Sequence, residues 1–379
     1  MDRKVVRSDD RSKYKRVAPG DLAYNMMRAW QGAFGSVVVE GMVSPAYVVA
    51  RPKTSLPTEW VEYLLRTEFA VNEIKRFSRG ITDFRLRLYW DEFKNLRICS
   101  PPTQERACIL RFLGRETAKI DALIAEQQRL IALLQEKRQA VISHAMTKGL
   151  NPDAPMKDSG VEWLGEVPEH WNVAASKHHW LVTDCKHVTA EFTQEGYPLA
   201  SNREAQGRWI DLTNAKRTTD EFYNLLTEGS RTPEPGDLVF TRNATVGEVA
   251  EVPAQIESFA LGQHVVILKK LKGGHCSSFA WHLLRSTAVS NQLERAMIGS
   301  TFRRINVEQI KAISVPIQPS HEQVSIAIYL EQVSDQWSKQ EQDASHCVSL
   351  LQERRAALIS AAVTGQIDVR GLVPEAGAA

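Results

Sequence analysis

At 379 residues the chain is long enough for two or three domains, and its hydrophobic content of 43% is that of an ordinary globular protein. The formal net charge is only +2, so the composition gives no global signature of nucleic-acid binding. The start of the chain is polar and basic, no apolar run reaches the roughly 20 residues of a membrane span, and the five cysteines are scattered. These features argue against a membrane protein and a secreted disulfide protein, and we expect a cytoplasmic one.

Residues 1–102 predict a first domain of mixed structure. Short β-branched runs at 37–39 and 46–49 indicate strands, and Gly20-Asp21 marks a turn. Lys and Arg outnumber Asp and Glu over residues 1–52, which suits phosphate contact, but on charge alone an ordinary solvated surface is the favoured explanation.

Residues 103–150 predict one long helix that begins after Pro101-Pro102. Apolar residues recur every seven positions, a spacing typical of a coiled coil. The seam comprises Leu113, Ile120, Leu134 and Val141.

Residues 151–319 predict a second mixed domain. Strands are indicated at 238–240 and 264–268, and Pro235-Gly236-Asp237 and Gly273-Gly274 mark turns.

Residues 320–366 predict a second long helix, followed by a tail over 367–379. Its apolar seam comprises Leu330, Trp337, Leu351 and Leu358. Two helices in the same register can cover each other's seams, so we expect an antiparallel coiled coil. The alternative is that each helix lies on its own domain.

An internal repeat joins these segments into one unit used twice. Leu133-Leu134-Gln135-Glu136-Lys137-Arg138 returns as Leu350-Leu351-Gln352-Glu353-Arg354-Arg355. Upstream, Gly20-Asp21-Leu22 matches Gly236-Asp237-Leu238, and Phe84-Arg85 matches Phe302-Arg303. Each copy is therefore a mixed segment followed by a long helix.

The run 157–171 contains Trp163-Leu164-Gly165 and Pro168-Glu169-His170-Trp171. This run resembles the segment that opens a target recognition domain in the family of type I restriction-modification specificity subunits. Residues 135–152 and 362–368 resemble the ends of its two conserved helices. The resemblance covers nearly the whole chain.

The resemblance implies an α+β fold in which two target recognition domains are separated by two long conserved helices. It implies that each domain reads one half of a split, asymmetric site in double-stranded DNA. The expected protein partners are two methyltransferase subunits and the motor-nuclease subunits. S-adenosylmethionine, ATP and Mg²⁺ are expected only in those partners, with no cofactor in this chain.

The first copy departs from the family pattern. Matching Gly20 to Gly236 leaves it without a counterpart of residues 161–216. We therefore expect the first recognition domain, 1–102, to be truncated at its N-terminus, as in a frameshifted fragment, a misassigned start or one half of a split subunit.

The sequence has no motif that indicates catalysis. It lacks both an Asn/Asp-Pro-Pro-aromatic methyltransferase motif and the Gly-rich phosphate loop of a motor protein. His178, His179, Cys185 and His187 lie close together, but their spacing does not match that of a zinc site. We expect no catalytic residue and no metal.

DNA reading requires Arg, Asn, Gln, Ser and Thr on projecting loops. Both copies carry such residues just after the Gly-Asp-Leu strand and again before the long helix. The predicted DNA-binding residues of the second copy are Arg242, Asn243, Thr245, Ser300, Thr301, Arg303 and Arg304; those of the first copy are Asn25, Arg28, Gln31, Arg79 and Arg85. The alternative is that these arginines brace the domain.

We interpret the chain as a non-catalytic DNA-recognition subunit. One rival is a specificity region detached from a fused methyltransferase-nuclease. Another is a coiled-coil adaptor, or an inactive or split half of a specificity subunit, without independent DNA recognition.

Overall fold

The computed structural model describes residues 12–80, 85–272, 274–297 and 304–372. The contacts divide the chain into two compact units, and each unit contains part of both long helices. Unit 1 comprises residues 1–130 and 343–379, and unit 2 comprises residues 131–342.

Unit 1 is built around a small antiparallel sheet with the order β3-β2-β5. Alternate residues of β2 are buried, because helices cover one face of this sheet. The elements of unit 1 before the first long helix are β1 (Lys15–Val17), β2 (Leu22–Asn25), η1 (Ala29–Gln31), β3 (Phe34–Ser36), β4 (Gly41–Val43), β5 (Tyr47–Ala50), α1 (Thr58–Leu65), α2 (Glu68–Phe77) and α3 (Trp90–Phe93).

Unit 2 has more strands. Those before its central sheet are β6 (Met156–Asp158), β7 (Glu166–Pro168) and β8 (Asn172–Ala175). Then follow η3 (Ser176–His178), β9 (Trp180–Asp184), β10 (Phe192–Thr193), β11 (Tyr197–Ala200), β12 (Lys216–Thr218), α5 (Asp220–Thr227), η4 (Gly229–Arg231), β13 (Leu238–Thr241), β14 (Val249–Glu251), β15 (Ala260–Leu261), β16 (Val265–Lys270), α6 (Ser277–Leu284), α7 (Thr287–Ala296), α8 (Val307–Lys311) and β17 (Ser314–Ile317).

The central sheet of unit 2 has the order β14-β13-β16-β9 and is buried on both faces. Side chains alternate along a strand, so Leu238 and Phe240 of β13 enter one apolar cluster, whereas Val239 between them enters another. This double burial explains why β13 and β16 are continuous apolar runs in the sequence.

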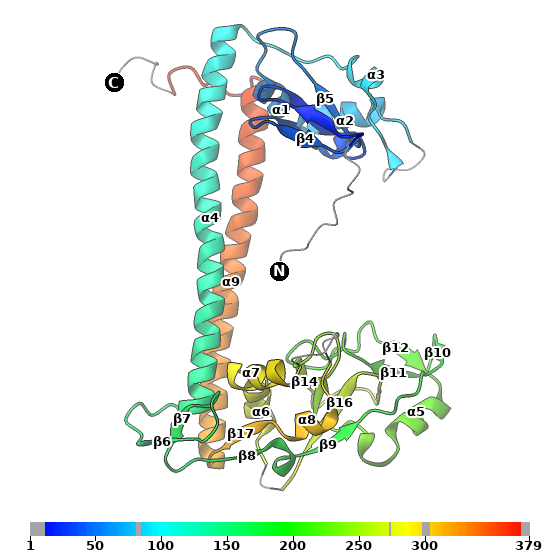
Figure 1. Ribbon diagram of the computed structural model, residues 1–379, viewed down its shortest axis with the longest axis vertical. Helices are drawn as coiled ribbons and strands as arrows, with labels where there is room; N and C mark the ends of the chain where they lie inside the picture. The colour runs from blue at the N-terminus through cyan, green and yellow to red at the C-terminus, as the bar shows by residue number, and fades with distance from the viewer. Residues whose placement is uncertain (1–11, 81–84, 273, 298–303, 373–379) are drawn as a thin grey trace. The chain divides into compact units, whose positions relative to one another are not determined.

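The long helices are α4 (Thr103–Lys148) and α9 (Ser320–Val363), and the predicted mixed fold with two such helices is confirmed. In unit 1 the start of α4 packs on the end of α9, where Leu113 shares a cluster with Ile359 and Val363. In unit 2 the end of α4 packs on the start of α9, where Met146 shares a cluster with Leu330. The helices lie side by side and antiparallel within each unit (Figure 1).

The two units share one hydrogen-bond pattern at the Gly-Asp-Leu turn. In unit 1 the Ala18 amide donates to Asp21 Oδ2 over 2.9 Å, and in unit 2 the Glu234 amide donates to Asp237 Oδ2 over 2.8 Å. Gly20 and Gly236 precede these aspartates with φ values of 90° and 86°, a left-handed conformation that favours glycine. The repeat seen in the sequence is therefore a repeat in backbone structure.

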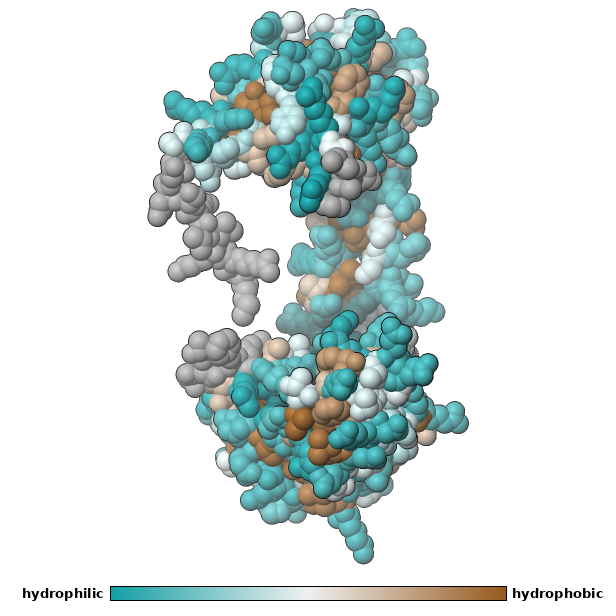
Figure 2. Space-filling view, turned by 90° about the vertical axis from the view of Figure 1, so that its right-hand side faces the viewer, coloured by the Kyte–Doolittle hydropathy of each residue, from teal (hydrophilic) through white to brown (hydrophobic). Residues whose placement is uncertain are grey.

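The surface is mainly hydrophilic on the face shown in Figure 2, where hydrophobic residues form small patches on both units. Within the described part of the chain, none of the helices has a stretch that is long and apolar enough to cross a bilayer.

Candidate nucleic-acid interface

Unit 1 places its first group of predicted DNA-binding residues on the turn that follows β2. Asn25 stabilises this turn, because its Oδ1 accepts a hydrogen bond from the Met27 amide over 2.9 Å. Arg28 and Gln31 are exposed at the start and end of the short η1 helix. The turn therefore presents one cation and one amide to solvent.

A second segment is joined to this turn through the backbone, since the Leu88 amide donates to the carbonyl of Met26 over 2.9 Å. Arg79 and Arg87 form an antiparallel bridge, and each amide donates to the other carbonyl over 2.9 Å. Gly80 is required here, because a Cβ at this position would lie 2.7 Å from the Arg85 carbonyl oxygen.

Three exposed arginines thus line one shallow groove of unit 1: Arg79, Arg85 and Arg87. Arg79 forms an ion pair with Glu92, which holds its side chain against α3. Met27 and Tyr89 lie in the same groove and are 42% and 41% exposed. Arginines interleaved with apolar and aromatic side chains suit contact with a nucleic acid.

Unit 2 places the corresponding turn directly after β13. Ala244 has φ 60°, and its amide hydrogen-bonds to Asn243 Oδ1 over 2.9 Å. This local bond favours the left-handed turn. Asn243 is half-buried and Thr245 is exposed, so the turn projects polar groups from a fully buried strand.

Arg242 lies beneath that turn, and only 4% of its side chain is exposed. Its Nη2 lies 2.9 Å from His187 Nε2, and its Nε lies 3.4 Å from Asp184 Oδ1. The guanidinium therefore joins the turn to the end of β9.

Arg304 is exposed beside Asn243, and the two residues form an isolated antiparallel bridge. The next amide, that of Ile305, donates to the Arg242 carbonyl over 3.0 Å. This bond is the counterpart of the bond from Leu88 to Met26 in unit 1. Three other predicted residues, Ser300, Thr301 and Arg303, lie outside the described residues.

The turn of unit 2 has a positive environment that affects its histidine. Burial lowers the pKa of His264, and the nearby Arg242, Arg304 and His187 lower it further. The lowered pKa keeps the His264 ring neutral at pH 7, so the positive charge beside it comes from the guanidinium groups of Arg242 and Arg304. Asp184 pairs with Arg242, and the exposed Arg304 suits an anionic ligand such as a phosphodiester.

The histidines of the candidate metal cluster are not brought together. His178 is exposed, whereas His179 is buried and stacks on His275 with a centroid distance of 4.3 Å. His187 instead contacts Arg242. Across the described residues no three His, Cys, Asp or Glu side chains are grouped so that they could hold a metal ion.

Sequence reasoning missed several residues at these places: Arg87 and Tyr89 in unit 1, and Asp184 and Asn202 in unit 2. It considered His187 only as a candidate metal ligand. The alternation Arg85-Leu86-Arg87 could have indicated Arg87, because alternate residues of an extended segment share a face. Asn202, whose Nδ2 donates to the Asn243 carbonyl over 2.6 Å, is distant in sequence and has no such signal.

Comparison with known proteins gives consistent results. Residues 194–344 match the type I restriction modification DNA specificity domain. The chain is 21% identical over 342 residues to a curated protein of Methanocaldococcus jannaschii named "Putative type I restriction enzyme MjaX specificity subunit". The match covers 87% of this chain and 75% of that protein.

Two solved structures share the fold. One comes from work on complex assembly and conformational transition of the type I R-M system; its TM-score is 0.65 at 18% identity, and the match covers 93% of this chain and 84% of that one. The other is the HsdS subunit of Thermoanaerobacter tengcongensis, with a TM-score of 0.51 at 16% identity and coverage of 93% and 83%.

Proposed function

This chain belongs, by its specificity domain and its fold, to the type I restriction-modification specificity subunits, and on that premise we propose that it reads a bipartite, asymmetric site in double-stranded DNA. It performs no catalysis itself. It directs two methyltransferase subunits, and with them the motor-nuclease subunits, to that site in the cytoplasm. S-adenosylmethionine, ATP and Mg²⁺ are used by those partners.

One observation supports this proposal most strongly. Each unit joins the turn after the Gly-Asp-Leu strand to the segment before its long helix through an equivalent backbone hydrogen bond. In both units that junction carries an exposed arginine and an amide-bearing side chain, which is the exposed Gln31 in unit 1 and the half-buried Asn243 in unit 2. Arginine suits guanine and Asn or Gln suits adenine, so each junction has the chemistry to read base edges.

Within unit 2 we assign different roles to Arg242 and Arg304, the two predicted DNA-binding arginines that lie among the described residues. Arg304 is exposed and is the direct contact, either with a base or with a phosphate. Arg242 is buried against Asp184 and His187, so we assign it a positioning role, in which it fixes the Asn243–Thr245 turn.

Duplex binding by fluorescence anisotropy tests the proposal. The chain is reconstituted with its cognate methyltransferase subunits, and the duplex carries the site that this complex methylates. Affinity should fall steeply as salt rises, because phosphate contacts release counterions. Binding that is weak and independent of salt would instead favour a coiled-coil adaptor.

The matched variants are Arg304→Ala and Arg217→Ala. Arg217 is also a basic residue of unit 2, but it belongs to β12 and its guanidinium pairs with Glu257 over 3.0 Å. If Arg304 reads a base, its loss should cost about 1–3 kcal/mol and relax the preference at one position. If Arg304 holds phosphate, binding should weaken equally on all sequences. If Arg304→Ala binds DNA as the Arg217→Ala control does, this junction is not part of the DNA interface.

A further inference from the structure

Two residues of unit 2 have a backbone conformation that glycine usually occupies. Ala244 has φ 60° and His264 has φ 76°, and they are the two non-glycine residues of the described part of the chain with a positive φ. The two lie close together, because Asn243, which precedes Ala244, places its Nδ2 3.3 Å from His264 Nδ1. Backbone strain of this kind is held in place by the surrounding structure and concentrates at ligand-binding sites.

The backbone frame shared by the two units does not require this conformation at residue 264. The Arg242 amide donates to the His264 carbonyl over 3.0 Å, and in unit 1 the Met26 amide donates to the Ala46 carbonyl over the same distance. His264 directly precedes β16, as Ala46 directly precedes β5. Ala46 nevertheless does not have a positive φ. The left-handed histidine is therefore a feature of unit 2 that the common fold does not impose.

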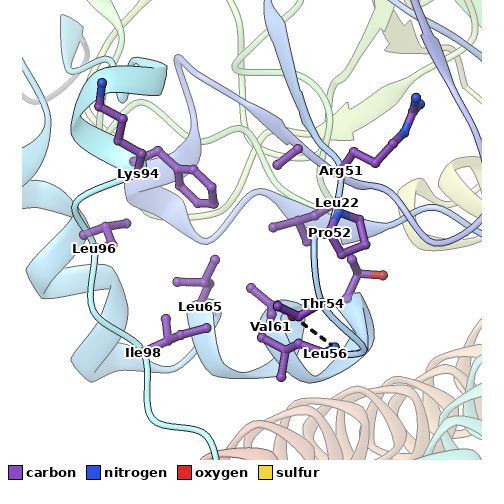
Figure 3. A pocket seen from close by; sticks show the side chains of 13 residues that line it. Leu22, Arg51, Pro52, Thr54, Leu56, Val61, Leu65, Lys94, Leu96 and Ile98 are labelled. Carbon is purple, nitrogen blue, oxygen red and sulfur yellow. Dashed lines mark hydrogen bonds between the residues drawn. The ribbon is translucent and has the colours of Figure 1, made fainter.

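The other ends of β5 and β16 also correspond. At each end a basic side chain reaches the aspartate of the Gly-Asp-Leu turn, with Arg51 Nε 2.8 Å from Asp21 Oδ1 and Lys269 Nζ 2.9 Å from Asp237 Oδ2. Figure 3 shows Arg51, which follows β5, and Leu22 of the neighbouring β2. Because the two strands match at both ends, Ala46 and His264 occupy the same position of one frame and differ in conformation and in side chain.

The hydrogen bonds of the turn determine which nitrogen of the exposed His264 ring carries a proton. Asn243 Oδ1 accepts from the Ala244 amide over 2.9 Å, so the Nδ2 end of the Asn243 side chain faces the ring. Nδ2 can only donate, and His264 Nδ1 is therefore the acceptor. The proton of the neutral ring then lies on Nε2. The ring thus has one N–H donor, which its contact with Asn243 leaves unused.

This donor is uncharged and lies among cations. Burial and the charges of Arg242 and Arg304 lower the pKa of His264, so its ring is neutral at pH 7. A phosphate binds the neighbouring guanidinium of Arg304 more strongly than a neutral imidazole, because a charged donor makes the stronger hydrogen bond. Base edges in the major groove instead offer neutral acceptors, namely purine N7, guanine O6 and thymine O4. The chemistry of His264 therefore suits a base better than a phosphate.

We propose that His264 determines specificity at one base pair, by donating from Nε2 to an acceptor on a base edge in the major groove, while Asn243 orients its ring. This inference rests on the proposed recognition of double-stranded DNA and assigns a base contact to a residue that sequence reasoning did not single out. The counterpart in unit 1, Ala46, has no side-chain donor. The two units would then read DNA with different chemistry at this position of the repeat.

The test compares His264→Gly with the matched control Ala244→Gly. Both variants relieve a left-handed residue, so each should raise the unfolding midpoint of the chain by about 2–4 °C. In the complex with the methyltransferase, His264→Gly should nevertheless bind the methylated site about three- to tenfold more weakly, because one hydrogen bond is lost. It should lose the preference at one base pair and keep the wild-type salt slope. Ala244→Gly should retain wild-type affinity and preference.

Three results would overturn this inference and leave the proposed function intact, provided that the wild-type complex binds its site in a salt-dependent manner. The first is unchanged affinity and base preference in His264→Gly. The second is equal weakening on all sequences with a shallower salt slope, which would assign the residue to a phosphate. The third is weaker binding together with a lower unfolding midpoint, which would assign it to the fold. A wild-type complex without salt-dependent duplex binding would overturn the proposed function and this inference together.

Discussion

At the scale of single residues, the two copies of the repeat place different chemistry on the same backbone. Met26 and Arg242 occupy equivalent positions, since both carbonyls accept the amide that leads toward the long helix. Unit 1 has an apolar side chain there, and unit 2 has a buried guanidinium beside Asp184 and His187. Asp184 and His187 belong to a segment of unit 2 that has no equivalent among the described residues of unit 1.

Arg242→Met, which introduces the residue of unit 1, should therefore weaken DNA binding indirectly. We expect loss of the Asp184 and His187 contacts to loosen the Asn243–Thr245 turn and to lower affinity about three- to tenfold on all duplexes alike. The measurement is anisotropy on the cognate site and its single-base variants. A change in preference at one base only would show that Arg242 contacts DNA directly.

Buried histidines make the stability of unit 2 depend on pH. Burial lowers the pKa of both His275 and His282 to about 3. The unfolded state, with ordinary pKa values near about 6.5, binds more protons below that pH than the folded state does. Above pH ~6.5 these histidines therefore do not reduce the stability of unit 2. As pH falls from there toward 3, they protonate mainly in the unfolded state, and the free energy of unfolding decreases.

When the pH falls from 7.5 to 5.5, each of these two histidines should lower the free energy of unfolding by about 1.4 kcal/mol. Urea unfolding at the two pH values measures the loss. His282→Leu should remove about 1.4 kcal/mol of this loss. His178→Leu, at an exposed site, should leave the loss unchanged. Equal slopes for all three proteins would contradict the assignment.

At the scale of elements, the long helices were predictable and the turns were not. Prolines before Thr103 and Ser320, together with the heptad spacing, placed both helices within a few residues of their observed ends. The environment of Arg242 could not be predicted, because its partner His187 is distant in sequence and reaches it only through the pairing of β9 with β16. From the sequence alone, an arginine that directly follows a strand is expected to be exposed, because the strand pairing that buries it is not known.

The helix seams give a graded stability prediction. Leu330 is fully buried against Ile142 and Met146 of the other helix, so Leu330→Ala should cost about 2–5 kcal/mol. Leu134 is half-buried, so Leu134→Ala should lower the free energy of unfolding by less. Leu123 is 53% exposed, and Leu123→Ala serves as the control, with an expected change within about 0.5 kcal/mol. Chemical denaturation measures all three, and equal losses would refute the observed packing of the helices.

At the scale of the whole molecule, the repeat predicts two equivalent places for methyltransferase subunits. Leu133 of α4 and Leu350 of α9 are equivalent in the repeat and are 51% and 50% exposed. Large exposed leucines at matching helix positions are the expected anchors of a helix-docked partner. Leu123 is equally exposed, but its counterpart in the repeat is Gln340, so it provides a control on the same helix.

Reconstitution with the methyltransferase, followed by native mass measurement, should give two copies per chain. Leu133→Glu and Leu350→Glu should each leave one copy, and the double variant should leave none, because a buried unpaired carboxylate opposes docking at each place independently. Leu123→Glu should still bind two. If the double variant also retains two copies, the partner docks elsewhere; if either single variant loses both copies, the two places are coupled and do not act as independent repeats.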